Sequence, residues 1–122
     1  MILCDTNIII EALKNNQSVI ESIEEIGISN IAISSVTVME LYYGARNKSE
    51  LKMIKRHLSS IQIFHIDDEI SITASDLIER YAKSHGLKIP DALIAATSII
   101  QDVQLFTLNT KDFKFIENIK LW

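Results

Sequence analysis

Short apolar runs that alternate with helical stretches are the feature that most constrains how this chain can fold. Runs of strand length occupy residues 2–4, 31–33, 61–66, 103–107 and 119–122. Strands of a parallel sheet are largely apolar because helices cover both faces of the sheet. We therefore expect an α/β fold, a three-layer α/β/α sandwich with a mainly parallel central sheet, in which residues 119–122 form an edge strand.

Apolar side chains at helical spacing occupy the segments between these runs. Their spacing predicts helices over residues 8–13, 18–26, 36–45, 51–61 and 70–84, and a further helix from Pro90 onward. Thr6 or Asn7 is the expected cap of the first helix. Gly27 and Gly86 are expected to end two of the others.

The size and composition of the chain favour one domain over residues 1–122. Of its 122 residues 48% are hydrophobic, 23 of them isoleucine, which is enough for a sizeable core. The single cysteine, Cys4, excludes an internal disulfide framework and a thiolate metal cluster. Because no stretch resembles a membrane span and the N-terminus lacks the basic segment of a signal peptide, we expect a soluble, cytoplasmic protein.

Four acidic residues are placed where the ends of the predicted strands would bring them together. Asp5 directly follows the first strand, and Glu40 lies in an apolar stretch of the helix after the second. Asp91 opens the helix that begins near Pro90, and Asp112 follows the fourth strand in a polar turn. Binding sites in parallel sheets form at the carboxyl ends of the strands. The four residues are therefore candidates for one site.

Each acid alone could have a structural role as a helix cap, a partner of a helix dipole, a turn residue or a surface charge. As a set they imply a cation, because two carboxylates about 4 Å apart repel by about 4 kcal/mol at an effective dielectric constant of about 20. Oxygen ligands without organised histidine or cysteine select Mg²⁺ or Mn²⁺. The three histidines, His57, His65 and His85, have no close metal-ligand spacing. Such an ion suits hydrolysis of a phosphodiester bond.

The overall charge argues against nucleic-acid binding through bulk electrostatics, since 12 basic and 16 acidic residues leave a net charge of −4. One segment is different. Residues 46–56 hold five cations and one acid, Glu50, a local charge of +4. It could be a solvated helix face or an edge that faces phosphates. The cations proposed to contact RNA are Arg46, Lys52, Lys55 and Arg56.

Four motifs of the chain resemble those of PIN-domain ribonucleases of the VapC-type toxin family. The first is D-T-N at residues 5–7, followed by isoleucines, and the second is S-V-T-V-M-E-L with a glycine soon after, over residues 35–44. The most specific is P-D-A-L-I-A-A at residues 90–96. The last is T-x-N-x-x-D-F at residues 107–113. Many family members place their fourth acid where this chain has Asn109, so Asn109 and Asp112 are both candidates for the fourth site residue.

The resemblance implies a PIN-like fold and a metal-dependent endoribonuclease, the toxin of a type II toxin-antitoxin module. It also implies a homodimer, RNA as the substrate, and a cognate antitoxin whose C-terminal segment occupies the active-site groove. Thr6, Thr107 and Asn109 would orient the carboxylates, the metal ion or a water molecule. The implied catalytic residues and ligands of Mg²⁺, or Mn²⁺, are Asp5, Glu40, Asp91 and Asp112.

Two alternatives remain at the level of the sequence. A phospho-receiver domain could use Asp5, Asp67, Asp68, Thr107 and Lys111, but no strand is predicted between residues 68 and 100, and Glu40 and Asp91 would have no role. A PIN-fold binding module without catalysis is the other alternative, although all four acids are present.

Overall fold

A computed structural model describes all residues, 1–122, and contains the six helices and four strands of an α/β fold. Two short 3₁₀ turns, Ile28–Asn30 and Thr110–Asp112, lie outside these elements. The elements follow one another as β1 (Ile2–Cys4), α1 (Thr6–Leu13), α2 (Gln17–Ile26), β2 (Ile31–Ser34), α3 (Ser35–Tyr43), α4 (Lys48–Leu58), β3 (Gln62–Phe64), α5 (Asp68–His85), α6 (Ile89–Gln101) and β4 (Gln104–Phe106).

The four strands form one parallel sheet in the order β3-β2-β1-β4. In register, Ile2 of β1 lies between Ile31 of β2 and Gln104 of β4. The chain first builds outward from β1 to β3 and then returns to place β4 on the free side of β1. This reversal lies between β1 and β4, and ligands of such sheets bind at the carboxyl ends of the strands beside it.

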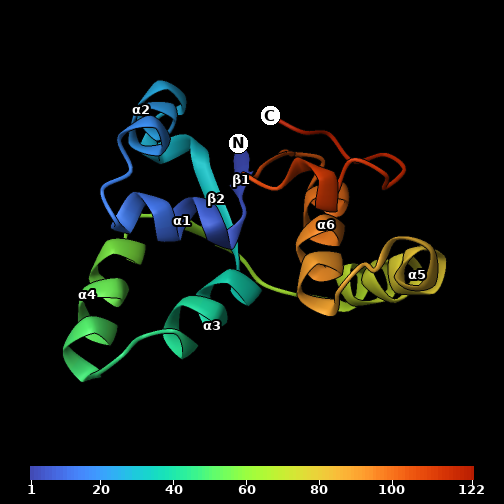
Figure 1. The fold of residues 1–122 in the computed structure, drawn as a ribbon, viewed down its shortest axis with the longest axis horizontal. Helices are drawn as coiled ribbons and strands as arrows, with labels where there is room; N and C mark the ends of the chain where they lie inside the picture. Colours follow the sequence, from blue (N-terminus) through green and yellow to red (C-terminus); the bar gives the residue numbers. More distant parts are fainter.

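Helices cover both faces of the sheet, which confirms the expected three-layer sandwich. Figure 1 shows α1, α2 and α4 on one side of the strands and α5 and α6 on the other. Successive side chains of a strand point to opposite faces of the sheet. Leu3 therefore packs with α5 and α6 on one face, and Cys4 packs with α1, α2 and α4 on the other. α3 contributes to both cores, through Val36 on one face and Leu41 on the other.

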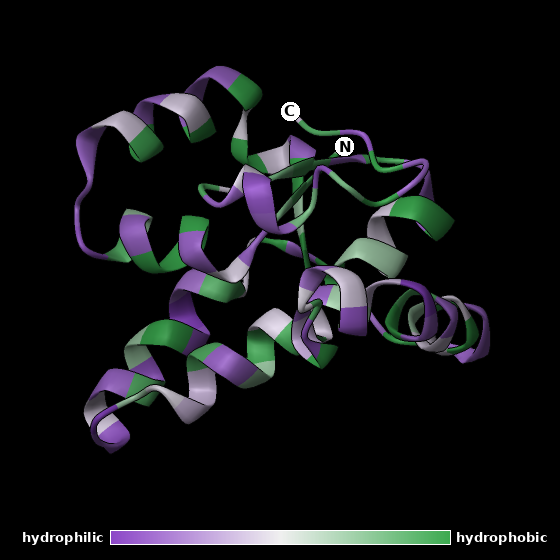
Figure 2. Ribbon diagram, turned by 45° about the vertical axis from the view of Figure 1, so that its right-hand side comes forward, coloured by the Kyte–Doolittle hydropathy of each residue, from purple (hydrophilic) through white to green (hydrophobic).

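Each helix has to bury one side and expose the other, and in Figure 2 the helices alternate between hydrophilic and hydrophobic segments along the ribbon. Gly27 and Gly86 end α2 and α5 with φ of 94° and 70°, a conformation that favours glycine. Pro90 lies in the first turn of α6. None of the helices combines the length and apolar character that a membrane span requires.

Two local predictions were wrong. α1 begins at Thr6 and is capped by Asp5, rather than by Thr6 or Asn7, because an oxygen of the Asp5 side chain accepts the Thr6 N–H. Residues 119–122 form no strand beyond a single bridge between Leu105 and Leu121. The N–H of Ile119 is used in a turn with the carbonyl of Ile116, so extended pairing starts only after it.

Candidate active site

Asp5 lies at the junction of β1 and β4, and both of its carboxylate oxygens have hydrogen-bond donors. Oδ1 accepts the backbone N–H of Thr6 at 2.8 Å, and Oδ2 accepts the hydroxyl of Thr107 at 2.8 Å. The Thr107 hydroxyl oxygen in turn accepts the backbone N–H of Asn109 at 3.0 Å. Asp5 is only 6% exposed. These bonds fix the orientation of a carboxylate at the reversal point of the sheet.

Glu40 is joined to the start of α1 through hydroxyl groups. Thr6 Oγ1 donates to Glu40 Oε1 at 2.7 Å and lies 2.9 Å from Thr37 Oγ1. The Thr6 hydroxyl has one hydrogen, and Glu40 receives it, so Thr37 must be the donor to Thr6. A chain of two hydrogen bonds therefore runs from the buried Thr37 through Thr6 to the exposed carboxylate of Glu40.

Asp91 is half-buried in the first turn of α6. Burial, followed by the negative charges of Asp5, Asp112 and Glu40, raises its pKa to about 6, and Lys88 opposes this shift. The pKa of Asp5 is raised by burial and by the charges of Glu40 and Asp112, although its hydrogen bonds counteract the increase. The charges of Glu40 and Asp112 therefore act on both Asp5 and Asp91.

The fourth position has two candidates in the structure as in the sequence. Asp112 ends the 3₁₀ turn after β4 and is exposed, and its charge raises the pKa of both Asp5 and Asp91. Asn109 reaches the site through its backbone, by its N–H bond to the Thr107 hydroxyl. Asp112 thus contributes a negative charge that acts on Asp5 and Asp91, and Asn109 donates its backbone N–H to the Thr107 hydroxyl.

The donor set fits a hard divalent cation. All four side chains offer carboxylate oxygens. Burial and then the charges of the other three acids raise the pKa of Asp91, and positive charge would relieve the repulsion among them. No three side chains of the His, Cys, Asp and Glu types lie close enough together to hold one ion by themselves. Mg²⁺ is usually bound by one or two carboxylates together with water and phosphate oxygens, which this arrangement permits.

The family model of the PIN domain matches residues 2–118. This chain belongs to the PIN-domain family. Ribonuclease VapC10 of Mycobacterium tuberculosis is 38% identical over 91 residues, which are 74% of this chain and 68% of that protein.

Two solved structures resemble the PIN-domain fold described above over nearly its whole length. A toxin-antitoxin complex from Klebsiella pneumoniae has a TM-score of 0.83 and 32% identity, and covers 98% of this chain and 95% of its own. VapBC2 from Rickettsia felis, bound to a DNA fragment from their promoter, has a TM-score of 0.84 and 30% identity. The match covers 100% of this chain and 98% of the chain in that structure.

Membership of the PIN-domain family excludes the phospho-receiver alternative, and the structure gives one of its key residues another role. Asp67 is the N-cap of α5, where its side chain accepts the N–H of Ile70 at 2.9 Å. It is therefore a structural residue at the start of the helix that leads away from β3.

The structure separates the predicted RNA-contacting cations into two groups. Lys52, Lys55 and Arg56 are exposed on α4, whose opposite side buries Ile54 and Leu58. Arg46 precedes α4, in the loop that follows α3, and lines a groove that also includes Glu40. Of these four cations, only Arg46 lines the groove that includes Glu40.

Sequence reasoning missed two residues beside the candidate site, Thr37 and Lys88. Thr37 lies one helical turn before Glu40 on α3, and this spacing of three residues could have indicated that both face the same way. Lys88 caps α6 three residues before Asp91 and is the cation that lowers the pKa of that carboxyl. A lysine two residues before a Pro-Asp pair matches no sequence pattern that would have indicated this effect on Asp91.

Proposed function

We propose that this protein is the endoribonuclease toxin of a type II toxin-antitoxin module and cleaves RNA phosphodiester bonds with Mg²⁺ or Mn²⁺. Residues 1–122 act as one domain in the cytoplasm. The observation that carries the proposal is the Asp5 carboxylate, fixed between β1 and β4 and close enough to Asp91 to help raise its pKa to about 6. The proposed ligands and catalytic residues are Asp5, Glu40, Asp91 and Asp112.

These carboxylates would hold a divalent cation, which would supply positive charge for activating water and for offsetting the negative charge that develops on the phosphate. The remaining work belongs to the chain itself. Thr107 and the N–H of Thr6 fix Asp5, and the Thr6 hydroxyl fixes Glu40, so both carboxylates are oriented before substrate arrives. Asp91 lies in the first turn of α6.

The partners follow from the same assignment. RNA is the substrate, and the fold shared with a toxin-antitoxin complex at 32% identity supports a cognate antitoxin as the protein partner. A homodimer is the proposed assembly. The RNA sequence that is cleaved depends on loop contacts and groove shape rather than on the residues that hold the metal ion.

Replacement of Asp5 or Asp91 by asparagine tests the proposal, since each change removes a charge and leaves the size of the side chain almost unchanged. We expect Asp5→Asn and Asp91→Asn to lower the rate of cleavage of labelled single-stranded RNA in Mg²⁺ by about 100-fold or more. Asp102→Asn is the matched control, because Asp102 lies at the opposite end of α6 and pairs with Lys120.

Circular dichroism should show that all three variants are folded. EDTA should stop cleavage by the unaltered protein. Cleavage by Asp5→Asn and Asp91→Asn at the parental rate would disprove the assigned mechanism. If the unaltered protein cleaves no RNA in Mg²⁺ or Mn²⁺, the catalytic function itself is wrong and the protein is a binding module of the PIN fold.

A further inference from the structure

Asp112 differs from Asp5 and Glu40 in how it is held. Hydrogen bonds fix the carboxylates of Asp5 and Glu40, whereas the carboxylate of Asp112 has no hydrogen bond or ion pair in the structure. Asp112 ends a 3₁₀ turn of three residues, and its side chain is exposed. The position of this carboxylate therefore depends on what holds the backbone of its turn.

The backbone after Asp112 continues as a run of overlapping turns. The N–H groups of residues 113 and 114 both donate to the carbonyl of Thr110, at 3.0 and 2.8 Å, and the N–H of Ile116 donates to the carbonyl of Phe113 at 2.9 Å. Phe113 and Ile116 are buried in the core and anchor one side of the run. Because the turns share residues, a shift of the other side, residues 115–117, would also move Asp112.

The last turns of α5 hold that other side. The ring of His85 stacks on the ring of Phe115, with centroids 4.3 Å apart and 14° between the planes, and Tyr81 contacts Phe115 edge-on at 5.3 Å. The Tyr81 hydroxyl oxygen accepts the backbone N–H of Glu117 at 3.2 Å. Arg80 Nη2 donates to Glu117 Oε2 at 2.7 Å. We call Arg80, Tyr81 and His85 the α5 cluster.

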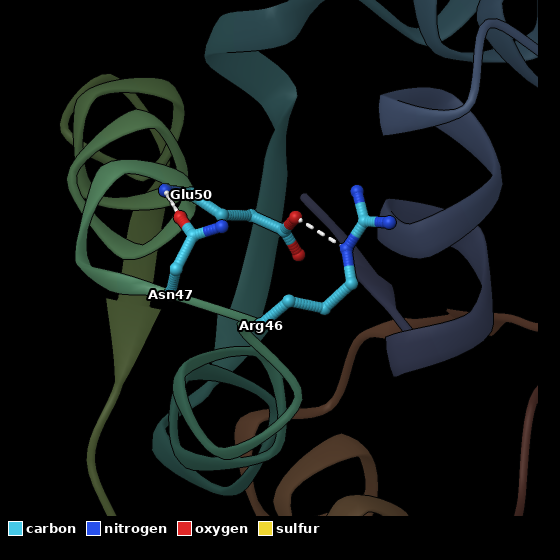
Figure 3. A network of polar contacts seen from close by, with 3 residues as sticks. All are labelled: Arg46, Asn47 and Glu50. Carbon is cyan, nitrogen blue, oxygen red and sulfur yellow. Dashed lines mark hydrogen bonds and ion pairs between the residues drawn. The ribbon is translucent and has the colours of Figure 1, made fainter.

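The α5 cluster joins parts of the chain that are distant in sequence. Arg80 and Glu117 are 37 residues apart. By contrast, Arg46 pairs with Glu50 only four residues away, so that pair braces the start of α4 alone (Figure 3). α5 has 18 residues and packs into the core through its buried side, so it is a firm support for the C-terminal segment.

We propose that the α5 cluster positions Asp112 for metal binding, acting through the backbone of residues 113–117. This inference rests on the proposed function, which makes Asp112 a ligand of the metal ion. Without these contacts the turn would allow the carboxylate a wider range of positions. Metal affinity would then fall, because supporting residues orient the ligands of a metal ion.

The test measures binding of Mn²⁺ in the absence of RNA, from the electron paramagnetic resonance signal of free Mn²⁺. The test variant combines Tyr81→Phe, which removes the acceptor of the Glu117 N–H, with His85→Ala, which removes the ring stacked on Phe115. We expect its Mn²⁺ affinity to be about tenfold lower than that of the parent. His85→Phe alone keeps a ring on Phe115 and should bind Mn²⁺ as the parent does.

A double-mutant cycle with Asp112→Asn separates positioning from a general loss of structure. In the Asp112→Asn background, the test variant should change Mn²⁺ affinity by no more than about twofold, because the carboxylate through which it acts is absent. A full loss of affinity in that background would overturn the proposal. So would an Asp112→Asn protein that binds Mn²⁺ as tightly as the parent, or a parent that binds none.

The matched control combines Lys120→Ala with Trp122→Ala. It also removes one polar contact and one ring contact of the C-terminal segment, the ion pair with Asp102 at 2.7 Å and the edge-on contact with Phe106 at 4.6 Å. These residues lie beyond the run of turns, so the control should keep the parental affinity, and an equal loss in control and test variant would disprove the positioning role.

Cleavage of labelled RNA at subsaturating Mn²⁺ gives a second measurement. The test variant should lower kcat and leave KM for RNA little changed, since the α5 cluster acts on the metal site. A parent that binds Mn²⁺ but cleaves no RNA would refute the proposed function, whereas the binding cycle alone decides on the positioning of Asp112. The two failures are therefore distinct.

Discussion

Neutral donors, rather than cations, hold the carboxylates of Asp5 and Glu40. Asp5 accepts a backbone N–H and the Thr107 hydroxyl, and Glu40 accepts the Thr6 hydroxyl. Such bonds orient the oxygens without cancelling their charge. Lys88 lowers the pKa of Asp91 but does not prevent the increase to about 6. The residues thus keep the negative charge that a divalent cation requires.

At the residue scale, the hydroxyl of Thr37 should matter for cleavage although it touches no carboxylate. Thr37→Val preserves the shape of the side chain but removes the donor to Thr6, so the Thr6 hydroxyl is less firmly oriented toward Glu40. We expect a fall in cleavage rate of about tenfold, the scale observed when supporting residues of metal sites are replaced. Thr37→Ser should restore the rate.

Thr97→Val is the control, because Thr97 is also completely buried and its hydroxyl donates only within α6, to the Leu93 carbonyl at 2.8 Å. Both valine variants should lose stability to a similar extent. A comparable loss of cleavage in the two, measured on fully folded protein, would mean that Thr37 has only a structural role.

The sequence indicated Asp5 and Asp91 because each has a position that can be inferred locally, one after an apolar run and the other after Pro90. Thr37 has no such signal. Its neighbours are apolar, and its role depends on where α1 begins relative to α3, which is a property of the folded sheet. The N-cap of α1 was predicted wrongly for the same reason. The Asp5 side chain both caps α1 and accepts the hydrogen bond from the Thr107 hydroxyl.

At the element scale, α4 combines a buried side with an exposed basic side. Lys52, Lys55 and Arg56 do not line the groove that includes Glu40, so they can contribute to RNA binding through charge alone. Replacing all three by glutamine should raise KM for RNA, leave kcat little changed and flatten the salt dependence of affinity by roughly 0.7 for each lost phosphate contact. An unaltered slope would make this side of α4 a solvated face or a protein-binding surface.

Periodicity predicted the helices of the chain because each has one buried side, and it predicted the four strands of the sheet because they are short apolar runs. It could not separate residues 119–122 from a true strand, since their composition fits either structure. The backbone N–H of Ile119 donates to the carbonyl of Ile116 and forms a turn at the start of this segment. No local apolar pattern reveals such a turn.

At the scale of the whole molecule, the central place of β1 creates the site. Because β4 returns to the free side of β1, Thr107 comes next to Asp5 although the two are 102 residues apart in the chain. The sequence predicts a parallel sheet and acids at the ends of its strands. The order of the strands depends on which helices share a face, and this cannot be deduced from any one segment.

The gathering of acids should make the stability of the metal-free protein depend on pH. Asp91 has a pKa of about 6 in the folded chain against an ordinary value of 3.8, and the pKa of Asp5 is also raised. The folded state therefore binds protons more tightly than the unfolded state. The resulting stabilisation is complete below the unfolded pKa and is lost as the pH rises through the folded pKa.

In EDTA, the melting temperature should consequently fall as the pH increases from about 4 to about 7. Asp91→Asn should reduce this fall and melt at a higher temperature than the parent at neutral pH, because it removes one of the repelling charges. Asp102→Asn should leave the slope in this range unchanged, since the Lys120 ion pair lowers the pKa of Asp102 and its titration lies at more acidic pH. Adding Mg²⁺ at neutral pH should raise the melting temperature of the parent more than that of Asp91→Asn. If the two proteins have the same pH dependence in EDTA and the same response to Mg²⁺, Asp91 neither experiences the charges of the other acids nor helps to bind the metal ion.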